Sequence, residues 1–268
     1  MNWQKYLTRE YSFLFISYAL DYYQLIREHV LVRGRGKLVS LYNIKEDNDN
    51  ILENINKEIT SEKVLEKINQ FNQLKEDCYT LANKIKQIKD KLEIKELLLQ
   101  LDNKFSEALS HYLYFIYLGY GGDKPKIKAF LEQYQEKFET ARNATLDADM
   151  DLIFAELFGK YDSTLELAPF MDRKEILDFL AGQDIDLERI NNRKKQYLII
   201  MKNKVIKEYP PSEINNVLHK ELPKVELNLK EVKGNIACQG IVEGKARIIF
   251  TKEDYQKIQE GDIIITPM

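Results

Sequence analysis

Hydrophobic residues recur at helical spacing over most of the chain. Between residues 3 and 28 they return at intervals of mostly three, four or six to seven, which predicts one amphipathic helix. A second helical region is predicted from about residue 51 to residue 117, after a polar break at Asp47–Asn50. Within it, residues 64–101 are rich in Lys, Glu, Leu and Ile and predict two helices that pack along one apolar stripe. Further helices are predicted at 125–144, 149–158, 172–181 and 212–222.

Strand-like runs interrupt this helical pattern in three places. Residues 29–43 hold β-favouring residues on both sides of the glycine-broken run Arg33–Lys37, which predicts a hairpin. Residues 197–209 predict a second hairpin around Lys202–Lys204. From Lys230 onward, glycines separate short strands, and Ile263–Ile265 is a candidate buried strand. The predicted fold is therefore a mainly α N-terminal region over residues 1–225, with one or two β-hairpins, followed by part of an α/β domain over residues 230–268.

Charge and cysteine content narrow the class of protein. The 268 residues include 40 basic and 43 acidic side chains, a net charge of -3, so we expect no general attraction to nucleic acid. The basic run Arg33–Lys37 is interpreted as a turn with solvated side chains. We expect no membrane partner and a cytoplasmic location, because the N-terminus lacks the pattern of a signal peptide. Cys78 and Cys238 lie far apart and outside any metal-binding spacing, which favours reduced thiols and no metal site.

The sequence contains few residues in patterns that are typical of catalytic or phosphate-binding sites. His29, His111 and His219 lie in contexts that favour structural roles, and there is no phosphate-binding loop of the Gly-x-x-x-x-Gly-Lys type. The carboxylates between Asp147 and Asp151 would point to different faces of a helix, so we interpret them as solvated. Gly119–Gly122 follows a helix pattern and predicts a helix stop.

The most informative segment is the C-terminal one, from Gly234 to Met268. Its spaced glycines allow close backbone approach at strand ends, and a Gly-Asp turn leads into the aliphatic run. This segment resembles the start of the mobile domain of phosphoenolpyruvate-utilising enzymes, a group that includes phosphoenolpyruvate synthase, pyruvate phosphate dikinase and rifampicin phosphotransferase. The positions that carry the resemblance are Gly240, Gly244, Ala246, Arg247, Gly261, Asp262 and Thr266.

The resemblance implies a swivelling α/β domain that carries a phosphoryl group on a histidine between donor and acceptor sites. That histidine follows a proline-containing loop in the family, so its counterpart would lie beyond Met268, and we expect the sequence to be truncated before it. No catalytic residue is therefore assigned here, and the chain by itself is expected to be inactive. For the complete enzyme the resemblance implies ATP or phosphoenolpyruvate with Mg²⁺, and a phosphoryl donor and small-molecule acceptor bound by missing or separate domains. A weaker likeness to the region preceding such domains involves Trp3 and Arg9, and Arg189 and Arg193.

Two alternatives remain open. The chain is also compatible with a helical interaction or scaffold protein whose C-terminal β unit serves for docking without catalysis. Met201-Lys202 stands in a hairpin, as the modified lysine of lipoyl and biotinyl domains does, but the flanking residues differ from that pattern.

Overall fold

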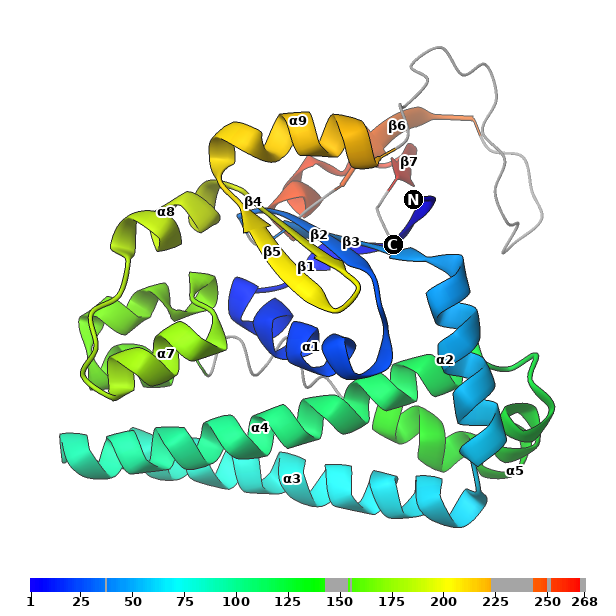
Figure 1. Ribbon diagram of the computed structural model, residues 1–268, viewed down its shortest axis with the longest axis horizontal. Coiled ribbons are helices and arrows are strands. Elements are labelled where there is room, and N and C mark those ends of the chain that lie inside the picture. Colours follow the sequence, from blue (N-terminus) through cyan, green and yellow to red (C-terminus); the bar gives the residue numbers. More distant parts are fainter. Residues whose placement is uncertain (37, 143–153, 155, 223–242, 250–251, 266–268) are drawn as a thin grey trace.

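A five-stranded antiparallel sheet lies among helices, and a separate pair of parallel strands stands near the C-terminal end (Figure 1). The computed structural model describes residues 1–36, 38–142, 154, 156–222, 243–249 and 252–265. The large sheet has the strand order β1-β3-β2-β4-β5, and the small one pairs β6 with β7. The strands are β1 (Trp3–Glu10), β2 (Val30–Arg35), β3 (Leu38–Ile44), β4 (Tyr197–Lys202), β5 (Val205–Tyr209), β6 (Lys245–Ile248) and β7 (Asp262–Ile265).

Helices make up most of the remaining described chain, which is therefore mostly helical with a mixed α/β character. Their starts carry side-chain caps, such as Ser12 before α1, Thr60 before α3 and Asp90 before α4. The α-helices are α1 (Phe13–Ile26), α2 (Lys45–Glu58), α3 (Ser61–Gln87), α4 (Lys91–Tyr120), α5 (Pro125–Arg142), α7 (Arg173–Leu180), α8 (Leu187–Lys195) and α9 (Pro211–Glu221), and the 3-10 helices are η1 (Ser163–Phe170) and η2 (Lys252–Lys257).

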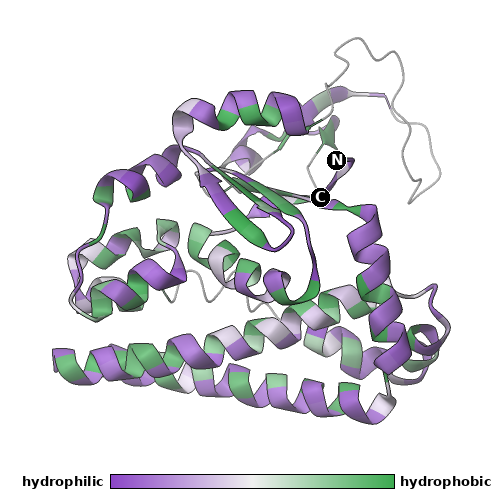
Figure 2. Cartoon of the chain, in the orientation of Figure 1, coloured by the Kyte–Doolittle hydropathy of each residue, from purple (hydrophilic) through white to green (hydrophobic). Residues whose placement is uncertain are grey.

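Helices from different parts of the chain pack on the two faces of the large sheet. Helix α1 packs on one face, where its apolar residues join those of β2, β3 and β4 in the main core. Helix α9 covers part of the other face through Ile214 and Leu218, which pack against Trp3, Leu31 and Ile200. Beyond α1, the long helices α3 and α4 lie side by side and extend the main core (Figure 1). Figure 2 shows the corresponding alternation of hydrophobic and hydrophilic positions along these helices.

The predicted single helix over residues 3–28 is wrong in its first part. Residues Trp3–Glu10 form β1, which pairs with β3, and the helix begins only at Phe13. The hydroxyl of Ser12 accepts a hydrogen bond from the backbone amide of Phe15 at 2.9 Å, which caps the helix start. Trp3 is buried against α9, so the spacing that suggested a helix comes from packing on two different elements.

The other predicted elements are confirmed in part. Both hairpins are confirmed as β2–β3 and β4–β5, and the second turns through Asn203 and Lys204, which both have positive φ angles (50° and 65°) as such tight turns require. The polar break at Asp47–Asn50 is wrong, because those residues lie in α2, where acidic side chains suit the first turn. Strand β7 forms as expected but is not fully buried, since Ile264 is 50% and Ile265 49% exposed. Among the described residues, no helix has both the length and the apolar character needed to cross a bilayer.

Candidate functional site

The motif residues of the C-terminal segment meet in the small parallel sheet. Lys245 pairs with Asp262 and Ala246 with Ile263, so the first half of the motif lies directly beside the second. Parallel strands need a long connection, and here it contains the 3-10 helix η2. The pairing of β6 with β7 thus brings Arg247 and Asp262, which are distant along the chain, into contact.

Glycine is required at one of these positions and favoured at a second. A Cβ atom on Gly244 would overlap the carbonyl oxygen of Gly261, so the strand start and the turn can approach this closely only without a side chain. Gly261 itself has a φ of +84°, in the left-handed region that favours glycine. The two glycines therefore allow the start of β6 to lie close to the start of β7.

An ion pair joins the same two strands. The Nε of Arg247 donates to Oδ2 of Asp262, and its Nη2 lies 3.3 Å from Oδ1. The backbone amide of Gln259 also donates to Asp262 Oδ2, at 2.8 Å. The bond from Arg247 is the largest influence that lowers the pKa of Asp262 below its usual range. Asp262 is therefore ionised near neutral pH. Its carboxylate stabilises the turn through these hydrogen bonds and has no proton to donate in catalysis.

Several predicted positions lie outside the described residues. These are Gly240 and Thr266 of the motif, together with Cys238 and the carboxylates Asp147–Asp151. The structure thus brings together five of the seven motif positions, namely Gly244, Ala246, Arg247, Gly261 and Asp262.

A second polar cluster surrounds Arg193, whose side chain is 1% exposed. Its Nε donates to Glu208 Oε1 at 2.7 Å and its Nη2 to Glu208 Oε2 at 2.9 Å. Its Nη1 donates to Glu175 Oε2 at 2.5 Å, and Asp172 lies 3.4 Å from Nη2. The guanidinium also stacks on Phe13, 4.1 Å from the ring centroid. One arginine of α8 therefore links α1, the start of α7 and β5.

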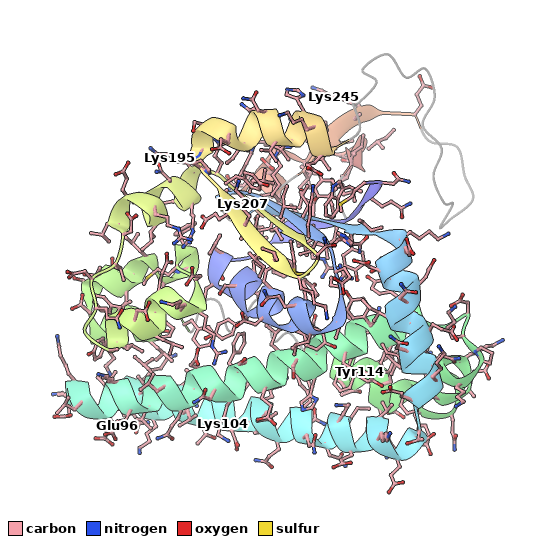
Figure 3. The ribbon with its side chains drawn as sticks, in the orientation of Figure 1. Glu96, Lys104, Tyr114, Lys195, Lys207 and Lys245 are labelled. Carbon is pink, nitrogen blue, oxygen red and sulfur yellow. The ribbon has the colours of Figure 1, made fainter. Side chains whose placement is uncertain are left out.

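The electrostatics of this cluster favour the charged forms. Burial alone would lower the pKa of Arg193, but Glu208 and Glu175 raise it above its ordinary value. Burial likewise works to raise the pKa of Glu208, and hydrogen bonds from Arg193 and Arg189 lower it below its ordinary value. Arg189 adds a contact of 3.0 Å from Nε to Glu208 Oε2. Figure 3 labels Lys195 and Lys207 on α8 and β5, two of the elements that this cluster joins.

Two hollows lie on either side of the Arg193 cluster. One, of about 400 Å³, lies between α8 and the start of α9 and includes Asn192, Gln196 and Tyr209 in its lining. The other, of about 570 Å³, lies between α1 and α7 and includes Leu20 and Lys174. Arg189, Arg193 and Glu208 line both. The guanidinium of Arg193 is already bound by carboxylates. We therefore assign Arg193 a structural role, which is to stabilise the part of the protein that separates the two hollows.

Sequence reasoning noticed Arg193 only through a weak likeness, and it missed Glu208, Glu175 and Asp172 as its partners. Only one half of the Asp172–Glu175 capping box could be recognised in the sequence. Asp172 stands at the start of the predicted helix over residues 172–181, where an N-cap residue is expected. No local signal connects that cap with an arginine on the next helix.

The three histidines take structural or exposed positions. Nδ1 of His29 lies 3.2 Å from Asp47 Oδ2, and His219 is exposed on α9. His111 lies within α4 and is buried, and burial lowers its pKa. No group of three or more His, Cys, Asp or Glu in the described parts of the chain could hold a metal ion.

The lysine considered for a lipoyl-type hairpin is engaged elsewhere. Lys202 donates to Glu221 Oε1 at 2.6 Å, and Trp3 Nε1 donates to the other oxygen of the same carboxylate at 3.0 Å. These contacts tie β4 and β1 to the last turn of α9, so Lys202 has a structural partner. Comparison of the chain with protein-family models, with curated proteins and with solved structures found no match.

Proposed function

We propose that residues 243–265 open the mobile domain of a phosphoenolpyruvate-utilising type of phosphotransferase. In this proposal the domain carries a phosphoryl group on a histidine that follows Thr266 in the complete protein. The helices and sheet of residues 1–222 form the platform on which the domain swings, or the module that binds the acceptor.

One observation carries the proposal: the motif residues form a single unit. The close approach of Gly244 to Gly261 needs glycine at the first position, and the positive φ of Gly261 favours glycine at the second. The ion pair of Arg247 with Asp262 accounts for two more positions of the family pattern. A chance set of turn residues would not have to meet in this way.

The chemistry assigned to this chain is limited to positioning. A phosphoryl carrier needs a neutral imidazole nitrogen as the nucleophile. None of the three histidines of the chain stands in a Thr-Ser-His context. The described residues also offer no cluster fit for Mg²⁺. In this proposal the donor, ATP or phosphoenolpyruvate with Mg²⁺, binds in other parts of the complete protein.

Labelling of the protein encoded by the whole reading frame tests the proposal. After incubation with radiolabelled phosphoenolpyruvate or ATP and Mg²⁺, it should carry a label that survives alkali and is lost in acid. Replacing the histidine of a downstream Thr-Ser-His motif by glutamine should abolish labelling, while His219→Gln, on an exposed face of α9, should leave it unchanged. The 268-residue chain should stay unlabelled.

Two results would contradict the proposal. One is a stable, acid-labile label on the 268-residue chain itself. The other is a reading frame with no such histidine motif soon after Thr266.

The second result would favour the alternative, an interaction protein whose β unit serves for docking. One observation supports that alternative. The small sheet leaves Ile248, Ile264 and Ile265 about half exposed, at 55%, 50% and 49%. A pull-down with the isolated chain and with an Ile264→Asp variant would then measure docking directly.

A further inference from the structure

The face of the large sheet on which α9 packs also carries a hollow, formed by residues of β1, β2 and β3 that do not belong to the α9 cluster. The hollow, of about 290 Å³, lies over β1, β2 and β3. We call it the β1–β3 hollow. It is lined by Lys5, Thr8, Arg33, Arg35, Leu38 and Ser40.

The strand register explains why these side chains converge. Ser40 of β3 pairs with Thr8 on one side and with Arg33 on the other. Arg35 follows two residues after Arg33, so both point to the same face, about 7 Å apart along the strand. Gly34 lies between them, and a Cβ there would overlap the ring of Tyr197. The glycine thus lets β2 sit close against Tyr197, which fixes the strand that carries both arginines.

The charges of the hollow have no counter-ion in the described parts of the chain. Lys5, Arg33 and Arg35 make no ion pair with any described carboxylate, and none of the described residues that line the hollow is Asp or Glu. Elsewhere in the protein, partly exposed cations do find partners, as Lys104 does with Asp77 at 2.6 Å. Three unpaired cations on one face stand out in a chain of net charge -3.

Two hydroxyl groups lie beside these cations. Thr8 Oγ1 and Ser40 Oγ are 2.9 Å apart and share one hydrogen bond. One of the two donates in that bond, so the hydrogen of the other is available to an acceptor. Thr8 is only 4% exposed, which places this pair deeper in the sheet surface than the charged groups.

We propose that the β1–β3 hollow binds the phosphate group of a small phosphorylated ligand. Arg33 and Arg35 hold the phosphate oxygens with their planar forks, Lys5 adds a third positive charge, and the hydroxyl pair donates a hydrogen bond. Three positive charges match a phosphate dianion better than a single carboxylate. The assignment stands on this geometry alone and does not depend on the phosphotransferase proposal.

The size of the hollow favours a small ligand over a polynucleotide. Its volume of about 290 Å³ is at the lower end of the range typical of small-molecule sites. Among the described residues of its lining there is no aromatic ring on which a base could stack. A solvated turn, the reading suggested by the sequence of Arg33–Lys37, accounts for the charges but not for their convergence with Lys5 and two hydroxyls from other strands.

Titration of the 268-residue chain with inorganic phosphate, followed through backbone amide chemical shifts, tests the proposal. We expect saturable shifts at the amides of Thr8, Arg33 and Ser40. The double variant Arg33→Gln/Arg35→Gln should weaken binding by about tenfold or more, because it removes two charge-assisted bonding groups. The control Lys89→Gln/Lys137→Gln removes the same charge from exposed positions elsewhere and should change binding less than about twofold, since distant exposed charges are screened.

Each possible result decides the matter. Saturable phosphate binding that depends on the arginines, is tighter than acetate binding and occurs in a variant with unchanged thermal midpoint supports the proposal. Absence of saturable shifts overturns it, and so does equal weakening by the control variant. Tighter binding of a single-stranded oligonucleotide than of glycerol phosphate at equal salt would instead make the surface a polyanion site.

Discussion

Replacing Arg193 by methionine removes a buried cation while keeping most of its apolar stem. In the native protein this guanidinium holds Glu208 by two bonds of 2.7 and 2.9 Å and Glu175 by one of 2.5 Å. Arg193→Met leaves these carboxylates, whose side chains are only 13% and 19% exposed for Glu175 and Glu208, without their main partner. The perturbation therefore tests whether the Arg193 cluster joins α8 to β5 and α7.

The magnitude follows from the burial of the pair. Removing one member of a buried ion pair costs about 3–5 kcal/mol, because the other member stays buried and uncompensated. For a chain of this size each kcal/mol lowers the melting temperature by roughly 2–4 °C, so the expected fall is roughly 6–20 °C. Arg189→Met is the matched control, because the Arg189 side chain is 48% exposed. Its loss should cost about 1 kcal/mol or less.

The effect should depend on pH in a definite direction. The folded-state pKa of Glu208 is lowered, so its contribution is present above the unfolded-state pKa of about 4.3 and is lost as the pH falls through the folded-state value. In Arg193→Met, Glu208 keeps Arg189 but loses the stronger of the two partners that lower its pKa, so it should take up a proton at higher pH than in the native protein. The stability difference between the two proteins should therefore shrink as the solution is acidified.

Urea unfolding, followed by far-ultraviolet circular dichroism and by the fluorescence of the single tryptophan, Trp3, measures the effect. The two probes must give the same transition for one free energy of unfolding to be quoted. A cost below about 1 kcal/mol for Arg193→Met, equal to that of the exposed control, would refute the reasoning.

Three further predictions concern separate parts of the molecule. Trp3→Phe removes the hydrogen bond to Glu221 and should lower the free energy of unfolding by about 1.5–3 kcal/mol, measured by urea unfolding with circular dichroism. Gly244→Ala forces a Cβ against the carbonyl of Gly261, so amide hydrogen exchange should speed up in β6 and β7 while the five-stranded sheet keeps its protection. Burial raises the pKa of Cys78 to about 12, so at pH about 8 its peptide should resist alkylation until urea unfolds the chain; equal labelling before and after unfolding would contradict this.

Local signals in the sequence were sufficient for the elements that begin and end on them. Pro125 opens α5 and Asp172 caps α7, as expected from positions that favour helix starts. The chain also leaves α4 at Gly121, within the glycine-rich stop. These features depend on neighbours a few residues away, so a single sequence displays them.

Strand β1 could not be predicted in the same way. The pairing register shifts between Lys5 and Leu7, which breaks the alternation that normally marks a strand. Its partner β3 and its cover α9 come from distant parts of the chain, and Trp3 owes its burial to the latter. A strand of this kind is defined by tertiary contacts, which override local preference.

The polar sites show the same division. The glycines of the C-terminal motif announce a turn, and the structure adds the contact of Arg247 with Asp262, to which the spacing gave no direct clue. The run Arg33–Lys37 was visible as a basic turn, whereas Lys5 and Thr8 join it only through strand pairing. Charged clusters assembled across a sheet are hidden from a reading along one dimension.

The order of strands in the large sheet has a consequence for biosynthesis. Strand β2 pairs on one side with β3, its neighbour in the chain, and on the other with β4, which is made only after all the helices from α2 to α8. While the ribosome produces those helices, the apolar edge of Val30–Val32 stays without its second partner. We therefore expect the nascent chain to need shielding of that edge until β4 emerges, and closure of the sheet to be the slow step of folding.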